Sequence, residues 1–399
     1  MNSIPRSRPR SRRVIDADTH VIEPYNLWTS RMSASKYGDL IPHVKHVSEK
    51  GEDCWFFGNN FVNGAASPAM AGWHETPPDH PKKMQDVKRY TWDASERLKL
   101  MDEYGIHAQV LFPNVVMLHA SKMLKNLARN EMAALSDIVR AYNDWQTDWS
   151  SAAPNRLLPQ SVLPFWDLDE SIKEMTRCAK MGHRGIVFTS EPHAFFGLPK
   201  LTNPMWDRLW AAAQDMELPI NFHIGSGEHE QHFVMDPSVS PRATYASQGV
   251  LFFMNNASAL TQLICGGICH RFPKLNFISV ESGVGWIPFA LASIDWQWIN
   301  CGVAKEHPEY DLLPSEYFKR QIYGSFWFEK ETLAPAISAL GADNILYETD
   351  FPHPTSMSPG PATSAKRPPD YIDEVFRDIP DVAADKILYG NAARLYHLD

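Results

Sequence analysis

The sequence lacks several features that mark whole classes of protein. None of its 399 residues form the apolar run of about 20 that a membrane-spanning helix needs. No apolar stretch of the kind found in a secretion signal follows the basic N-terminal segment, and the five cysteines show no framework spacing. The net charge of −9 is spread along the chain and argues against nucleic acid or an anionic membrane as a main partner. We therefore expect a cytoplasmic protein.

A glycine-rich phosphate turn is also absent near the first predicted strand, which disfavours a doubly wound sheet. Instead, eight short apolar runs alternate with longer helical patterns, as in a (β/α)8 TIM barrel. Their continuous apolar character predicts strands that are buried on both faces. The runs are residues 14–20, 108–113, 157–165, 185–190, 219–225, 276–282, 322–328 and 345–351.

Two insertions interrupt this alternation within one predicted barrel domain, residues 14–399. Residues 25–92 follow the first strand and residues 226–257 follow the fifth. Because both follow strand C-termini, where barrel enzymes place their active sites, they are candidates for a lid and a pocket wall, or for interface elements. The basic segment 1–13 is interpreted as a flexible arm or as an arm that crosses to a neighbouring subunit.

Acidic and imidazole side chains gather where the predicted strands end. Asp18 and His20 close the first strand, and residues two apart in a strand point to the same side. His223 lies in the fifth strand, Glu281 ends the sixth and Asp350 ends the eighth. Because all strand C-termini meet at one end of a barrel, we expect these five side chains to form a site for a divalent metal.

Two further residues decide how many ions such a site would hold. If Glu23 and His353 also reach inward, the set exceeds what one tetrahedral ion needs, and Glu281 could bridge two ions. Alternatively, Glu23 caps the following loop or forms a salt bridge, and His353 supports Asp350.

Three residues are candidates for substrate binding: Trp286, His229 and Glu191. Trp286 could equally be core packing, and His229 a solvated loop residue. The aromatic surroundings indicate a small organic substrate with apolar surface. No cluster of arginines stands at the strand ends, which disfavours a phosphate or a polycarboxylate.

The motifs DADTH, NFHIG, VESGVGW, YETDFPHP and KILYGNAARLY resemble the amidohydrolase-related family. This family includes aminocarboxymuconate semialdehyde decarboxylase and the resorcylate-type decarboxylases. The resemblance runs from Val14 to Leu398 and is weakest over 25–92. It implies a (β/α)8 barrel with a divalent metal, often zinc, whose ligands here would be Asp18, His20, His223 and Asp350, and a metal-bound water.

The sequence departs from the commoner family pattern at two of these positions. The first-strand motif is D-x-H rather than H-x-H, and Glu281 stands where a proton-transferring histidine is common. More carboxylate oxygens favour manganese or iron over zinc. The replacement at Glu281 also puts the decarboxylase mechanism in question.

The main functional prediction is a metal-dependent hydrolase of a C–N or C–C bond, with Glu281 or Asp350 moving the proton. The alternatives are a dinuclear iron or manganese monooxygenase similar to isobutylamine N-hydroxylase, a non-oxidative decarboxylase, and a catalytically silent subunit. We expect one or two ions of Zn, Mn or Fe per chain and a small-molecule substrate. A homo-oligomer or a pairing with a paralogous subunit is also expected.

Overall fold

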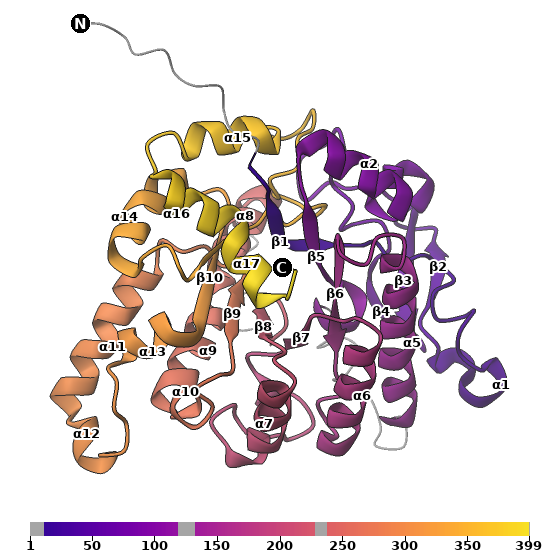
Figure 1. Ribbon diagram of the computed structural model, residues 1–399. Helices are drawn as coiled ribbons and strands as arrows, with labels where there is room; N and C mark the ends of the chain where they lie inside the picture. Colours follow the sequence, from indigo (N-terminus) through magenta and orange to yellow (C-terminus); the bar gives the residue numbers. More distant parts are fainter. Residues whose placement is uncertain (1–11, 119–131, 228–237, 399) are drawn as a thin grey trace, which may run out of the picture.

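The computed structural model describes residues 12–118, 132–227 and 238–398 (Figure 1). Its centre is an eight-stranded parallel sheet in the order β1-β5-β6-β7-β8-β9-β10-β11. A parallel bridge between Thr19 and Phe351 joins the first strand to the segment after the last one, so the sheet closes. The predicted (β/α)8 barrel is confirmed, and each of the eight predicted runs contains one strand. These are Ile15–His20, Ala108–Phe112, Leu157–Val162, Gly185–Phe188, Ile220–His223, Phe277–Val280, Ile322–Phe326 and Ile345–Tyr347.

Every residue of the eight strands is buried, which explains their uninterrupted apolar runs. One face of the sheet fills the barrel with side chains such as Ile15, Val110 and Leu158. The other face packs under the surrounding helices. Polar residues are therefore tolerated in these strands only where they find partners or serve a site.

Helices surround the barrel (Figure 1). Asp93 begins α2 by accepting hydrogen bonds from the amides of Ser95 and Glu96, and Gly105 ends it with φ 68°. Asp167 caps α6 in the same way. The helices outside the insertions are α2 (Ala94–Tyr104), α3 (Val115–Leu118), α5 (Met132–Ser150), α6 (Leu168–Lys180), α7 (Asp207–Asp215), α9 (Phe253–Cys265), α10 (Ile268–Arg271), α11 (Ile287–Cys301), α12 (Val303–Glu306), α13 (Pro314–Gln321), α14 (Lys330–Leu340), α15 (Pro368–Val375), α16 (Asp381–Asp385) and α17 (Asn391–Leu395).

The insertion at 25–92 contains the short helix α1 (Ala34–Tyr37) and an antiparallel sheet. The sheet consists of β2 (His43–Val47), β3 (Glu52–Phe57) and β4 (Asn60–Gly64). The insertion is anchored on α5, because Trp28 Nε1 donates to the carbonyl of Ile138 (3.0 Å). It also reaches the segment after β11, where the amide of Met70 donates to the carbonyl of Pro352 (2.8 Å).

The described part of the second insertion is mainly α8 (Pro241–Leu251). Arg242 of this helix pairs with Asp79 of the first insertion at 2.7 Å and also contacts Thr76. The two insertions therefore touch each other. Their roles as lid and pocket wall stay predictions.

Only the end of the basic arm lies within the described residues. Arg12 pairs with Asp381 and Asp385 of α16, and Arg13 lies over the ring of Tyr389 at 5.6 Å. These two residues are therefore docked on the barrel. Among the described residues, no helix combines the length and apolar character needed to cross a membrane.

Candidate metal centre and active site

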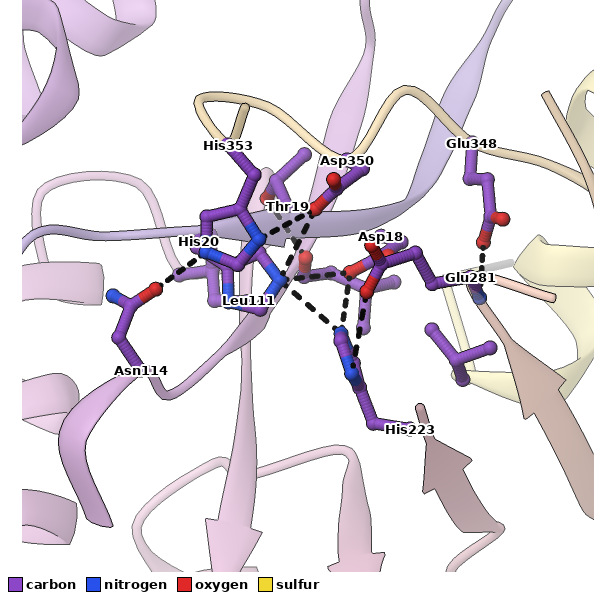
Figure 2. A network of polar contacts seen from close by, with 12 residues as sticks. Asp18, Thr19, His20, Leu111, Asn114, His223, Glu281, Glu348, Asp350 and His353 are labelled. Atoms are coloured by element: carbon purple, nitrogen blue, oxygen red, sulfur yellow. Dashed lines mark hydrogen bonds and ion pairs between the residues drawn. The ribbon is translucent and has the colours of Figure 1, made fainter. Parts of the chain in front are cut away.

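Six of the predicted site residues meet at the C-terminal ends of four barrel strands (Figure 2). These residues form two overlapping sets, and within each set the possible ligand atoms all lie within 4.8 Å of one another. One set is Asp18, His20, His223 and Glu281, and the other is His20, Glu281, Asp350 and His353.

A register shift in β1 between Asp16 and Thr19 shapes the first part of the cluster. Both Asp18 and His20 face the other site residues, as the sequence predicts, and Nε2 of His20 lies 3.5 Å from Oδ1 of Asp18. The same nitrogen lies 3.4 Å from Oδ1 of Asp350. The amide of Asp350 donates to the carbonyl of Asp18 (3.0 Å), which fixes the two carboxylate-bearing segments side by side.

Backbone carbonyls set the orientation of the two histidine rings. Nδ1 of His20 donates to Pro113 (3.2 Å), and Nδ1 of His223 donates to Ile224 (2.8 Å). Each neutral ring therefore presents an unprotonated Nε2, and these two nitrogens are 3.1 Å apart. Ligands that share one ion at about 2.1 Å are separated by roughly this distance.

The carboxylates of Asp18 and Asp350 are buried, and histidine nitrogens lie 2.9–3.5 Å from them. None of their four oxygens has a hydrogen bond of ordinary geometry within the described part of the chain. Burial raises the pKa of Asp350 well above its usual range, and the nearby charges of Glu281 and Asp18 add to the effect. Buried anionic oxygens of this kind call for a cation, so the donor set fits a divalent metal.

The electrostatics around His223 support the same conclusion. Burial alone would lower the pKa of His223, but the Asp18 carboxylate 3.4 Å away, Glu281 and the carbonyl of Ile224 together raise it, and the net result is a pKa of about 9. Without another cation, the cluster draws a proton onto a ring that should be neutral. A bound metal ion would supply that positive charge instead.

Glu281 occupies a different position from the other acidic residues. Its Oε2 lies 3.5 Å from Nδ1 of His223, and its side chain is 15% exposed whereas those of Asp18 and Asp350 are almost fully buried. Burial raises its pKa above the ordinary carboxyl range. Glu281 is therefore the acid of the cluster that a bound substrate can reach most easily.

Strained backbone holds the two acidic residues in place. Glu281 and Asp350 both have φ of 57°, in the left-handed region that side chains other than glycine disfavour. The amide of Glu281 donates to Oε2 of Glu348 (3.2 Å), a buried residue at the end of β11. Residues kept in this conformation by their surroundings cluster at functional sites.

The structure places Glu23 outside the cluster. Its Oε1 accepts hydrogen bonds from the backbone amides of Asn114 (2.9 Å) and Val115 (3.1 Å), and its Oε2 accepts from the Asn114 side chain (3.0 Å). It thus binds the start of α3, which is the capping role left open by the sequence. His353 does reach the site, where its Nδ1 lies 2.9 Å from Oδ1 of Asp350.

Two of the three predicted substrate residues lie within the described part of the chain, and they follow different strands. Trp286 is half-buried after β9, donates to the carbonyl of Ser282 (2.9 Å) and lies 5.7 Å from the ring of Phe253. Glu191 follows β7 and accepts from Asn255 (3.1 Å). His229 lies outside the described residues. Contact of these residues with a substrate stays a prediction.

Sequence reasoning missed two residues of the site, Tyr245 and Asn114. Burial and then the charges of Asp350 and Glu281 raise the pKa of Tyr245 to about 12, so this tyrosine of α8 lies within electrostatic range of the cluster. The insertion that contains Tyr245 has no strand pattern, so no pattern in the sequence points to this residue. Asn114 follows β5 and contacts His353, and its position just beyond a predicted strand was the only available signal.

The amidohydrolase family profile matches residues 15–398, nearly the whole chain. The chain belongs to the amidohydrolase family. This confirms the family resemblance of its strand-end motifs.

Curated and solved members of the family show what this chain is similar to. It is 25% identical over 317 residues to gamma-resorcylate decarboxylase of Rhizobium radiobacter, an alignment that covers 76% of this chain and 86% of that protein. An amidohydrolase structure from Mycobacterium avium subsp. paratuberculosis superposes with a TM-score of 0.75, at 17% identity and over 96% and 99% of the two chains. A dihydroxybenzoic acid decarboxylase from Polaromonas, with bound manganese and 2-nitroresorcinol, superposes with a TM-score of 0.58, at 20% identity and over 97% of each chain. At these identities the two structures support the fold alone.

Proposed function

We propose that this amidohydrolase-family protein is a metal-dependent, non-oxidative decarboxylase of a small hydroxylated aromatic acid. The similarity to gamma-resorcylate decarboxylase over 76% of the chain carries this proposal. From the sequence alone we expect a hydrolase and keep a decarboxylase as an alternative. The similarity to decarboxylases favours that alternative. The monooxygenase alternative depended on Glu23 as an extra ligand, and Glu23 binds Asn114 and Val115 instead.

In this proposal Asp18, His20, His223 and Asp350 hold one divalent ion. Manganese suits the two carboxylates among these ligands, and a solved relative carries manganese. When bound, the ion would act as a Lewis acid toward oxygen atoms of the substrate. The identity of the ion stays part of the proposal.

The reaction breaks the bond between the ring and the carboxyl carbon, which leaves as carbon dioxide, and the ring carbon gains a proton. Glu281 is our candidate for holding that proton, because burial favours its protonated form. Its side chain is also more exposed than those of Asp18 and Asp350. The commoner family pattern has a proton-transferring histidine where this chain has Glu281. In this proposal the Glu281 carboxyl takes that role, since a carboxyl with a raised pKa can serve as the acid.

In this proposal, residues around the cluster orient the substrate. Tyr245 of α8 could donate its phenolic proton to a substrate oxygen, and Trp286 could cover the ring of an aromatic acid. Glu191 and His229 stay candidates for the pocket wall.

Carbon dioxide release from 2,6-dihydroxybenzoate with added Mn²⁺ tests the proposal. We predict that Asp350→Asn lowers kcat by at least about 10³-fold, because it removes an anionic ligand, while far-ultraviolet circular dichroism is unchanged. The control is Asp343→Asn, because Asp343 is exposed and pairs with Lys386 on the surface. Wild-type protein that retains Mn²⁺ but releases no carbon dioxide from hydroxybenzoates would refute the proposed reaction, as would full activity of Asp350→Asn.

A further inference from the structure

A buried chain of hydrogen bonds connects Glu23, which lies outside the metal cluster, to that cluster through Asn114 and His353, and Figure 2 shows its Asn114–His353 part. Glu23 binds the backbone and side chain of Asn114, and Asn114 binds His353. His353 in turn lies against Asp350 and stacks on the ring of His20, with ring centroids 3.7 Å apart. Glu23, Asn114 and His353 are all at most 8% exposed.

The contacts of Asn114 leave one orientation for its side-chain amide. Its Nδ2 faces the carbonyl of Val21 at 2.9 Å and Oε2 of Glu23 at 3.0 Å. Both partners are acceptors, so the atom between them must be the NH₂ group. The Oδ1 atom of Asn114 therefore faces His353, and it lies 2.6 Å from Nε2 of that ring.

This orientation decides where His353 carries its proton. Because Oδ1 of Asn114 can only accept, Nε2 of His353 must donate. In the neutral ring Nδ1 then has no proton and directs its lone pair toward Asp350, whose Oδ1 is 2.9 Å away. Two acceptor atoms this close need either a proton on Asp350 or a cation near both of them, and their separation suits two ligands of one ion.

We propose that Glu23 and Asn114 are a positioning pair that holds His353 in the tautomer protonated on Nε2, so that Nδ1 joins Asp350 in binding a divalent metal. The metal-binding half of this inference rests on the proposed function, whereas the tautomer half does not. Glu23 reinforces the Asn114 orientation that the Val21 carbonyl also favours, since its carboxylate oxygens accept from the Asn114 side chain and from two backbone amides.

Glu23→Gln is the central variant. The glutamine oxygen can still accept from the amides of Asn114 and Val115, but its NH₂ group would face the NH₂ group of Asn114. That repulsion weakens the preference for this Asn114 orientation, which the Val21 carbonyl still supports, and so raises the share of His353 protonated on Nδ1. Glu174→Gln is a matched control, because Glu174 is a buried glutamate that accepts from the side chain of Asn143 (2.8 Å) away from the cluster.

The first measurement is Mn²⁺ affinity of the full-length protein, determined by competition with a chelator. We expect Glu23→Gln to weaken binding about 10- to 100-fold, the usual range for residues that orient a ligand, and Glu174→Gln to leave it unchanged. Equal affinities of wild type and Glu23→Gln would overturn the metal-binding half of the proposal.

The second measurement is nitrogen-15 NMR of the metal-free protein labelled at histidine, with His353 identified by the signals lost in His353→Gln. We expect an Nε2-protonated ring in the wild type and more of the Nδ1-protonated form in Glu23→Gln. Asn114→Ala, which removes the acceptor, is the second variant. An unchanged tautomer in both variants would overturn the positioning role.

The two measurements separate failure of this inference from failure of the proposed function. A wild-type protein that binds no Mn²⁺ refutes the manganese centre, yet the tautomer comparison in metal-free protein still decides the role of Glu23 and Asn114. A protein that binds Mn²⁺ but releases no carbon dioxide refutes only the decarboxylase reaction.

Discussion

His183 illustrates how a buried histidine can limit stability without taking part in the site. It precedes β7, is 2% exposed, and its Nε2 donates to Thr147 Oγ1 (2.9 Å). Burial lowers the pKa of His183 from 6.5 to about 4. The folded protein therefore keeps this ring neutral at pH values where the unfolded chain already binds a proton.

We predict that His183 makes the protein less stable in mild acid. Because its folded-state pKa is the lower one, its contribution is complete above pH 6.5 and is lost as the pH falls toward 4. At pH 5 the loss relative to pH 7 is of order 2 kcal/mol. Urea unfolding of wild type and His183→Gln at both pH values measures it.

Glutamine can keep the hydrogen bond to Thr147 but cannot titrate. The fall in unfolding free energy from pH 7 to pH 5 should therefore be smaller in His183→Gln. An equal fall in both proteins would assign the acid sensitivity to other groups.

Individual ligands could be predicted from the sequence where strand geometry alone decides their direction. Asp18 and His20 are two apart at the end of a strand, and His223 and Asp350 end other strands of the same barrel. Glu23 lies beyond the strand, where the chain turns, so its direction depends on contacts with residues near position 114 that local sequence does not reveal. The role of Asn114 depends on the orientation of its amide, which only its three-dimensional partners define.

At the scale of elements, helix α2 secures the seam of the barrel through Arg97. This side chain is fully buried and donates to the carbonyls of His20 (2.8 Å) and Tyr90 (2.7 Å) and to Oε1 of Gln109 (3.1 Å). Its guanidinium also lies 4.3 Å from the ring centre of Phe351. One arginine therefore satisfies polar groups on β1 and β5 and also lies against Phe351, which takes part in the barrel closure.

We predict that Arg97→Leu lowers the free energy of unfolding by about 3–5 kcal/mol, because several buried acceptors lose their donor. Chemical unfolding followed by tryptophan fluorescence measures the change. Arg89→Leu is the control, since Arg89 is exposed, pairs with Asp93 and lies over the ring of Trp92 at the surface. We expect that control to cost less than about 1 kcal/mol; similar losses in the two variants would contradict the seam role of Arg97.

The barrel strands were easier to predict from the sequence than the antiparallel strands of the first insertion, of which β3 has buried residues but no continuous apolar run. The eight barrel strands are buried on both faces and stand out as continuous apolar runs. The antiparallel strands β2–β4 were not predicted: β2, with the sequence HVKHV, has no buried residue, and β4 begins at an exposed turn. Such strands carry little of the hydrophobic pattern on which a prediction relies.

At the scale of the whole molecule, a metal ion that binds only the folded chain must also stabilise it. With free Mn²⁺ at 100 times its dissociation constant, binding would add about 2.7 kcal/mol to the free energy of unfolding. We predict that a chelator lowers the melting temperature of the wild type, and that Asp350→Asn shows little response. Calorimetry with and without chelator tests this, and equal shifts in both proteins would contradict metal binding through Asp350.

The parallel bridge between Thr19 and Phe351 has a consequence for how the protein is made. Thr349 binds Asp16 through its amide (2.9 Å) and its hydroxyl (2.6 Å), across 333 positions of the chain. A chain still emerging from the ribosome holds Asp18 and His20 long before it gains Asp350, which follows them far along the sequence. Pairing over so long a loop carries a large entropic cost and is slow. A nascent chain therefore cannot assemble this metal centre early, and a chain cut short before Asp350 would lose both an essential ligand and the closure of its barrel.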